Sequence, residues 1–174
     1  GTKSSPTRYT NRSFSGTLDA STSDALWGGI EMQVTAYDAG RNAKFRLLNG
    51  STTQFYVSAN SATNIVVGGG SATEVDTGIS SGRSTRLYLF NIDLSGAEPV
   101  AKLWISPFDF SSEVALGTPS VTITNIGAVY TAFSLSMSGG NHSYYDEIRI
   151  GTTLEDAWLT LPPVPPLATI IVVR

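Results

Sequence analysis

Apolar and polar positions alternate along much of the chain, and this alternation predicts β-strands. In residues 30–37 (IEMQVTAY), Ile30, Met32 and Val34 fall on one face, while the residues between them fall on the other. A period of two residues is typical of a strand with one buried face. The stretch that follows, residues 38–42, has the composition of a turn, and Asn49-Gly50 is a strong hairpin signal.

The same pattern recurs and is broken by Gly, Pro, Asn and Ser turns, which is typical of a β-sandwich. Arg86–Leu94 is apolar on both faces and is therefore expected to be a central strand. Thr152 and Glu155 have the spacing of a capping box, so at most one short helix is predicted, at Leu154–Trp158. We predict nine strands: Ile30–Tyr37, Ala43–Leu48, Gln54–Ala59, Asn64–Val67, Arg86–Leu94, Val100–Ser106, Ser120–Ile126, Tyr130–Met137 and Tyr144–Ile150.

The two ends of the chain differ from its body. Residues 1–13 are predicted to form an N-terminal arm, residues 14–160 the sandwich, and residues 161–174 a Pro-rich spacer and a terminal strand. A β-prone apolar segment avoids aggregation when it pairs with an edge strand of its own domain or with a neighbouring copy, and both placements stay open. The residues expected to form this assembly strand are Leu167, Thr169, Ile170, Ile171, Val172 and Val173.

Composition excludes several classes of function. Only 14% of the residues are charged and the net charge is −3, which argues against a nucleic-acid-binding surface. There is no apolar run long enough to span a membrane. A single histidine and no cysteine exclude Cys/His zinc sites, cysteine nucleophiles and iron–sulfur clusters. A low-charge chain rich in Ser, Thr and Gly indicates an extracellular or cell-surface location.

Two stretches carry a resemblance. Residues 85–107 contain TRLYLFNIDL and VAKLWISP, and residues 145–158 read YDEIRIGTTLEDAW. Over residues 30–158 the chain resembles the concanavalin A-like, LamG-type jelly-roll domains of bacterial secreted and surface proteins, of planctomycete and verrucomicrobial type. The resemblance implies an all-β jelly-roll sandwich of two antiparallel sheets. Residues 163–169 are similar to a degenerate form of the sorting tail with which such proteins often end.

Catalysis by paired carboxylates is not predicted. Glycosidases need two carboxylates about 5–9 Å apart, and the Glu-x-Asp-x-x-Glu string of glycosidases with this fold is absent. Glu31 has no acidic neighbour on its own strand face. Asp146 and Glu147 are adjacent and point to opposite faces, where Glu147 can pair with Arg149. We therefore expect no enzymatic activity, and a glycoside hydrolase or lyase is only a remote alternative.

Calcium is the one cofactor that the sequence leaves open. LamG-type domains often bind it at a loop rim, and Ca²⁺ takes six to eight oxygen ligands. The candidate ligands are Asp38, Asn42 and Asp109, which do not form an Asp-x-Asp cluster.

Glycan binding is predicted from aromatic residues beside amide or carboxylate groups. Alternation places one of Tyr144 and Tyr145 outward. The candidate residues are Trp27, Phe108, Asp109, Asn141, His142 and Tyr144. The main prediction is a non-catalytic structural or adhesive protein that assembles with copies of itself, and the alternative is a monomeric glycan-binding module with an extracellular polysaccharide as its partner.

Overall fold

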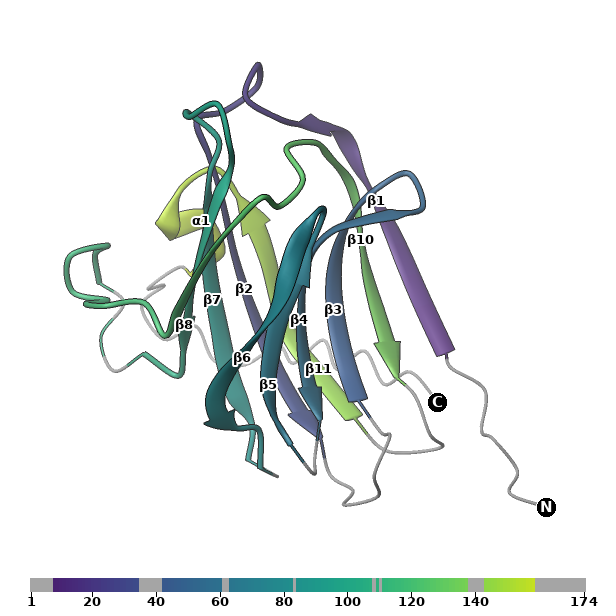
Figure 1. The fold of residues 1–174 in the computed structure, drawn as a ribbon, viewed down its shortest axis with the longest axis vertical. Coiled ribbons are helices and arrows are strands. Elements are labelled where there is room, and N and C mark those ends of the chain that lie inside the picture. Colours follow the sequence, from purple (N-terminus) through teal and green to yellow (C-terminus); the bar gives the residue numbers. More distant parts are fainter. Residues whose placement is uncertain are drawn as a thin grey trace, which may run out of the picture.

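The chain folds into a sandwich of two antiparallel β-sheets (Figure 1). The computed structural model describes residues 8–34, 42–60, 63–82, 84–107, 109, 111–137 and 143–158. The six-stranded sheet has the order β1-β10-β3-β4-β5-β6, and the five-stranded sheet has the order β11-β2-β7-β8-β9. The strands are β1 (Arg8–Leu18), β2 (Ala25–Val34), β3 (Asn42–Asn49), β4 (Thr52–Asn60), β5 (Asn64–Gly69), β6 (Ala72–Ser80), β7 (Arg86–Asp93), β8 (Val100–Ile105), β9 (Val121–Thr124), β10 (Tyr130–Met137) and β11 (Ser143–Gly151).

The core lies between the two sheets. The predicted buried face of β2 is confirmed, because Ile30, Met32 and Val34 are at most 3% exposed. Phe90, in the middle of the central strand β7, packs against Phe45 and Phe55 of the opposite sheet, with ring centroids 5.6 and 5.2 Å apart. The predicted hairpin at Asn49-Gly50 is also confirmed, since Asn49 pairs with Thr52 and Gly50 has a φ of 58°.

All nine predicted strands form, and the structure adds two strands at sheet edges. β1 begins at Arg8, so part of the expected N-terminal arm, from Arg8 to Ser13, is paired with β10. β6 was not predicted. Both are edge strands with few apolar residues: only Phe14 and Leu18 of β1 and Ala72, Val75 and Ile79 of β6 pack against the core. Such strands need little apolar surface, so their sequences resemble those of loops.

β2 begins five residues earlier than predicted, because two glycines lie inside it. A Cβ on Gly28 would lie 2.1–2.7 Å from the ring of Phe90, and one on Gly29 would lie 2.8 Å from the carbonyl oxygen of Ala157. Both glycines therefore mark close approaches within the fold and not a turn. Thr35–Tyr37, the end of the predicted strand, lie outside the described residues.

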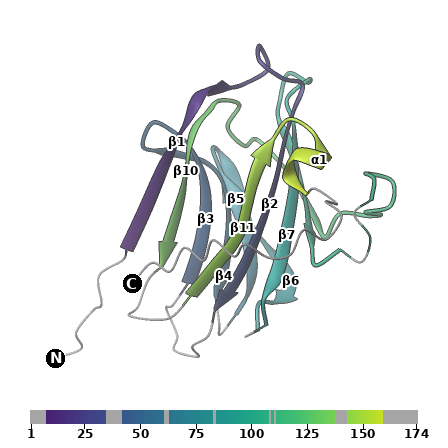
Figure 2. The same cartoon turned by 180° about the vertical axis from the view of Figure 1, so that it is seen from behind.

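The helix α1 (Leu154–Ala157) covers the upper outer face of the five-stranded sheet (Figure 2). Its capping box is formed by Thr153 and Asp156, one residue later than the predicted pair. Asp156 Oδ2 accepts hydrogen bonds from the backbone amides of Thr152 (3.1 Å) and Thr153 (3.0 Å). Within the part of the chain that the structure describes, no helix is long and apolar enough to cross a membrane.

A second apolar cluster lies beneath this helix. Trp27 and Trp104 stack with ring centroids 6.0 Å apart, and Leu89, Leu116 and Ala157 pack around them. Trp27 is only 5% exposed. The expectation that its ring is available to a glycan is therefore wrong, because helix α1 and the segment that carries Leu116 bury it.

Candidate functional site

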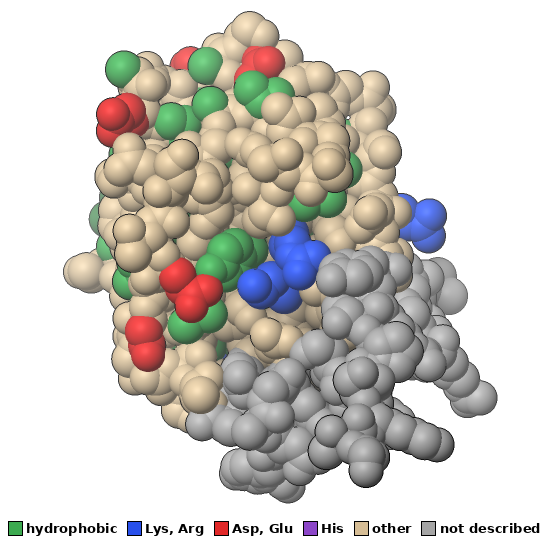
Figure 3. Space-filling model, turned by 45° about the vertical axis from the view of Figure 1, so that its right-hand side comes forward, with side chains coloured by type: hydrophobic (Ala, Val, Ile, Leu, Met, Phe, Trp, Pro, Cys, Tyr) green, Lys and Arg blue, Asp and Glu red, His purple; other side chains and the backbone are tan. Residues whose placement is uncertain are grey.

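The outward side of the six-stranded sheet carries a group of mixed polar and aromatic side chains. Phe45 and Val57 point into the core, so the alternating residues Lys44, Arg46 and Tyr56 point outward. β5 and β6 add further polar residues on the same side. We call this group the polar face; it consists of Lys44, Arg46, Tyr56, Asn64, Glu74 and Asp76. Figure 3 shows basic side chains on one side of a group of hydrophobic and acidic ones.

The ring of Tyr56 lies across the neighbouring strand. Tyr56 pairs with Gly68 of β5. A Cβ at Gly68 would lie 2.8–3.0 Å from the hydroxyl end of the ring, so only glycine leaves the space that the ring occupies. The Tyr56 hydroxyl reaches β6, where it donates a hydrogen bond to the carboxylate of Glu74. Partial burial, together with this bond and the charge of Glu74, raises the pKa of Tyr56.

Two basic side chains border the ring on the β3 side. Arg46 is the cross-strand partner of Tyr56, and Lys44 Nζ lies 4.1 Å from the centroid of the Tyr56 ring. This distance is that of a cation–π contact. Burial, and then the charge of Arg46, lowers the pKa of Lys44, whereas the carboxylate of Glu74 opposes that change.

Acidic and amide groups border the ring on the β6 side. Glu74 and Asp76 are exposed. Asn64 Nδ2 donates to Asp76 Oδ2 over 3.3 Å, and Asp76 Oδ1 accepts a hydrogen bond from the amide of Gly78 at 2.8 Å. The polar face therefore has basic groups at one end, acidic and amide groups at the other, and a flat aromatic ring between them.

The sheet backbone behind Lys44 is held from the opposite sheet. The Tyr145 hydroxyl donates to the carbonyl oxygen of Ser136 (2.5 Å) and accepts from the amide of Lys44 (3.0 Å). Burial raises the pKa of Tyr145, which keeps the hydroxyl protonated and able to donate. Beside this bridge, the hydroxyl of Ser134 is buried without a hydrogen-bond partner.

Of the six residues predicted from sequence for glycan binding, three lie within the described structure: Trp27, Asp109 and Tyr144. Tyr144 is 55% exposed and Tyr145 points inward, as alternation predicts. Tyr144 lies opposite Gln33 in the five-stranded sheet, on the other side of the molecule from the polar face. Phe108, Asn141 and His142 lie outside the described residues, as do the assembly-strand residues Leu167, Thr169, Ile170, Ile171, Val172 and Val173.

Two of the three candidate calcium ligands, Asn42 and Asp109, lie within the described structure. Asp109 is exposed and accepts a hydrogen bond from the amide of Ser111 (2.9 Å), which lowers its pKa. Asn42 begins β3 and pairs with Asn60, and Asp38 lies outside the described residues. Among the residues that the structure describes, no three His, Cys, Asp or Glu side chains are grouped so that they could hold a metal ion.

Glu31 has acidic neighbours that its own strand does not reveal. It pairs with Asp146 across β2 and β11, and its pKa is raised by burial and then by the charges of Asp146 and Glu147. β11 is irregular at this point, with a φ of 48° at Glu147. The predicted pairing of Glu147 with Arg149 is confirmed at 2.8 Å.

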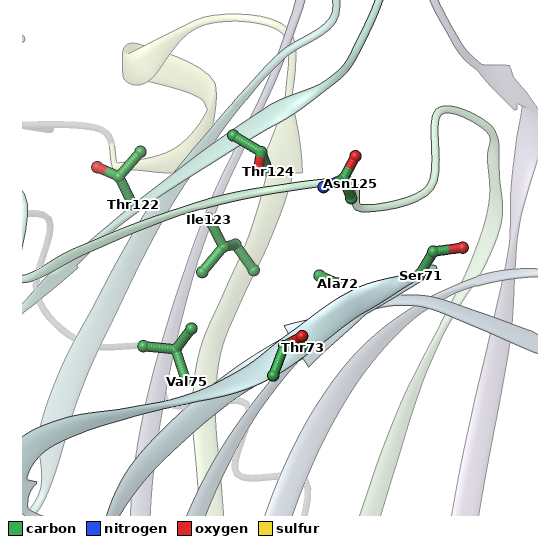
Figure 4. Close-up of a pocket in the computed structure, with 8 residues that line it drawn as sticks. All are labelled: Ser71, Ala72, Thr73, Val75, Thr122, Ile123, Thr124 and Asn125. Carbon is green, nitrogen blue, oxygen red and sulfur yellow. The ribbon is translucent and has the colours of Figure 1, made fainter.

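A groove of about 270 Å³ separates the edge strands of the two sheets, β6 and β9. Figure 4 shows Val75 of β6 and Ile123 of β9 pointing toward each other across it. Thr73, Thr122 and Thr124 also line the groove and supply hydroxyl groups. The groove has no aromatic or charged lining residue, so it offers neither a ring on which a sugar could stack nor a charged group to bind it.

Sequence reasoning missed the polar face as a site. Lys44 and Arg46 lie two residues apart in a predicted strand that alternates clearly, and Tyr56 lies in the strand predicted to pair with it. The register of the two strands joined by the Asn-Gly hairpin could therefore have predicted that Lys44, Arg46 and Tyr56 lie close together. Glu74 could not have been added, because β6 itself was not predicted.

Comparison with known proteins identifies the fold and shows no family for this chain. No family model and no curated protein matches the chain. Among solved structures, a chain named as a sialidase matches 87% of this chain with a TM-score of 0.57 and 12% identity. The protein has a concanavalin A-like β-sandwich fold. This sandwich corresponds to 15% of the length of that sialidase chain. A Caenorhabditis elegans galectin, LEC-6, matches 75% of the chain and 90% of its own length at 18% identity, with a TM-score of 0.37.

Proposed function

We propose that this concanavalin A-like sandwich is a non-catalytic glycan-binding module and that the polar face is its binding surface. The observation that carries the proposal is the Tyr56 ring, which lies across Gly68 between basic and acidic side chains. An aromatic ring stacks on the C–H face of a sugar, and the groups at its edge bond the sugar hydroxyls. Lys44 and Arg46 supply donors, while Glu74 and Asp76 supply acceptors.

The ring is held in place before any ligand binds. Its hydroxyl is fixed by Glu74, one face is fitted over a glycine, and the ammonium group of Lys44 lies over the ring, so a sugar that stacks on the ring displaces that ammonium group. A side chain that is already ordered loses little conformational entropy on binding, which favours affinity at a small surface. The sialidase that shares this fold is consistent with the proposal. The structural similarity covers only a small part of the sialidase and therefore does not indicate that this chain shares its activity.

The test is a glycan array probed with the wild type and with two tyrosine variants. Tyr56→Ala removes the ring from the polar face, and Tyr144→Ala removes an exposed tyrosine from the five-stranded sheet. We expect the wild type to bind a defined set of glycans, Tyr144→Ala to keep that set, and Tyr56→Ala to lose it. Equal loss in both variants, or loss in Tyr144→Ala alone, would place binding elsewhere. Far-UV circular dichroism checks that each variant is folded.

The structural or adhesive role, which is the main prediction from the sequence, stays a prediction. It depends on the assembly strand within residues 167–173, which lies outside the described residues. The polar face favours the glycan-binding module, because it is a specific arrangement of side chains within the described structure.

A further inference from the structure

The two described sheets have four edges, and three of these edges are protected against pairing with a further strand. The edge strands are β1 and β6 of one sheet and β11 and β9 of the other. β6 has a bulge, within which the carboxylate of Asp76 accepts a hydrogen bond from the amide of Gly78 (2.8 Å). β11 also has a bulge, where the carboxylate of Asp146 accepts from the amide of Glu147 (2.9 Å). β1 carries two arginines in its sequence RYTNRSFSGTL. Bulges and charged side chains both hinder the addition of another strand to an edge.

The fourth edge strand, β9, has neither a bulge nor a charge. Its sequence is Val-Thr-Ile-Thr, and its pairing with β8 is regular over all four residues. Among the described residues, β9 is the last strand of its sheet, so the backbone groups on its outer side have no partner strand there. Its short length is the one protective feature that it has. β9 is therefore the edge of this sandwich that is most open to a further strand.

The groove between β6 and β9 lies beside this open edge. Ile123 of β9 is only 5% exposed and points across the groove toward Val75 of β6 (Figure 4). A strand added to β9 would direct every second side chain toward the space between the sheets, where the groove lies. Because no charged or aromatic residue lines the groove, it suits aliphatic side chains. The edge and the groove together fit a short, uncharged strand with aliphatic residues at alternate positions.

Residues 167–173 (LATIIVV) have the properties that this edge requires. They carry no charge, and residues 170–173 are all β-branched, which favours an extended strand. Whichever alternate set faces the groove, it includes isoleucine and valine. The segment is also longer than β9, so it can pair with the whole of that strand.

The chain can reach β9 from Trp158, the last described residue. The ring of Trp158 lies 3.5 Å from the position of a Cβ on Gly29 of β2. Gly29 shares a cross-strand row with Leu89 and Trp104, and the next row holds the pair that begins β9. Three strand spacings of about 4.8 Å separate β2 from β9, which is about 14 Å. Residues 159–166 (LTLPPVPP) are rich in proline and span about 25 Å at about 3.1 Å per residue, which is sufficient.

We propose that residues 167–173 pair with β9 of the same chain and form the outer strand of this sheet, with aliphatic side chains in the groove. A segment tethered within reach of an edge has an effective concentration of about a millimolar. The edge of its own chain therefore outcompetes that of a neighbouring copy when the protein is at micromolar concentration. The inference is independent of glycan binding, because the polar face is the outward side of the other sheet.

The experiment is paramagnetic relaxation enhancement on the full chain labelled with ¹⁵N. The chain contains no cysteine, so Thr169→Cys provides a single attachment site for a nitroxide. The same label is placed in a variant that also carries Ile170→Asp and Ile171→Asp, which puts a carboxylate on each face of the segment. Ile170→Val with Ile171→Val is the matched control. A mixture of nitroxide-labelled chain at natural isotope abundance with ¹⁵N chain that lacks the nitroxide detects contacts between copies.

We expect the strongest loss of amide signal at residues 121–124 of β9 and 72–75 of β6, with no such loss in the mixture. The two valines retain this pattern and the two aspartates abolish it, because an apolar groove strongly disfavours a carboxylate. Signal loss that is strongest at β1 or β11, or that is absent from the sandwich, would overturn the inference. Persistence of the pattern with the two aspartates would also overturn it. Equal signal loss in the mixture would place the segment on a neighbouring copy and refute pairing within the chain.

Discussion

Gly68→Ala displaces the Tyr56 ring without removing it. The new methyl carbon would lie 2.8, 2.9 and 3.0 Å from Oη, Cζ and Cε1 of Tyr56. Gly68 does not have a positive φ, so alanine can adopt the same backbone conformation. The ring is the far end of a side chain that can rotate, and we expect it to swing away from the sheet. It then loses its bond to Glu74 and its contact with the ammonium group of Lys44.

The expected change in stability is small and the expected change in binding is larger. A partly exposed hydrogen bond and a cation–π contact each contribute about 0.5–1 kcal/mol. Glycine within a strand is less favourable than alanine by about 0.5–1 kcal/mol, which offsets part of that loss. With the middle value of each range, the free energy of unfolding should therefore fall by about 0.8 kcal/mol. Loss of the stacking surface should weaken glycan affinity about tenfold, which corresponds to about 1.4 kcal/mol.

The assay is calorimetric titration with the strongest glycan from the array, together with urea denaturation of the same samples. Gly16→Ala in β1 is the matched control, because a Cβ at that position meets nothing within 4 Å. We expect Gly16→Ala to bind as the wild type does. If Gly68→Ala also binds with wild-type affinity, the position of the Tyr56 ring does not matter and the reasoning is refuted.

Four other changes test the fold around the site. Tyr145→Phe should lower the free energy of unfolding by about 1–3 kcal/mol in urea denaturation, because it leaves a buried amide and a buried carbonyl without the bridging hydroxyl; an unchanged value would show that the bridge is dispensable. Ser134→Ala should change it by less than about 0.5 kcal/mol, since its hydroxyl has no partner to lose, and a larger loss would contradict that assignment. Burial raises the pKa of Tyr88 to about 12 in the folded protein, whereas in the unfolded chain its hydroxyl ionises at about 10. About 3 kcal/mol of the free energy of unfolding should therefore be lost as the pH rises from about 10 to about 12. An alkaline titration in which all tyrosines of the folded protein ionise near 10 would contradict this. Asp156→Ala should cost about 1 kcal/mol, because it removes the carboxylate that accepts hydrogen bonds from the amides of Thr152 and Thr153 at the start of α1. Thermal denaturation with an unchanged midpoint would argue against the cap.

The sequence predicted the central strands well because their burial leaves a clear pattern. β2, β7 and β10 alternate or are apolar on both faces. The bounds of β7 and β10 were predicted to within one residue, and the buried face of β2 was predicted although the strand begins five residues earlier. Edge strands such as β6 are harder, since one side of each faces water and polar residues are tolerated there. Gly28 shows a different limit: a glycine that gives room to a distant aromatic ring looks like a turn in the sequence.

The candidate site was harder to predict than the fold. Sequence reasoning favoured aromatics in loops, but Trp27 is buried by α1 and Leu116, which are far from it in the chain. It overlooked Tyr56, because a tyrosine in a strand is most often a half-buried sheet residue. The position of its ring depends on Gly68, which lies just beyond the predicted strand Asn64–Val67, and on Glu74 of β6, a strand that was not predicted. Short-range patterns reveal strands, whereas a binding surface arises from their pairing.

The central claim is that glycans bind the polar face of the six-stranded sheet. The most direct measurement is NMR chemical-shift mapping of the ¹⁵N-labelled protein during titration with the strongest array ligand. We predict that the largest amide shifts cluster at Lys44, Arg46, Tyr56, Gly68 and Glu74. Shifts that centre instead on Tyr144 and Gln33, or on the groove between β6 and β9, would contradict the account.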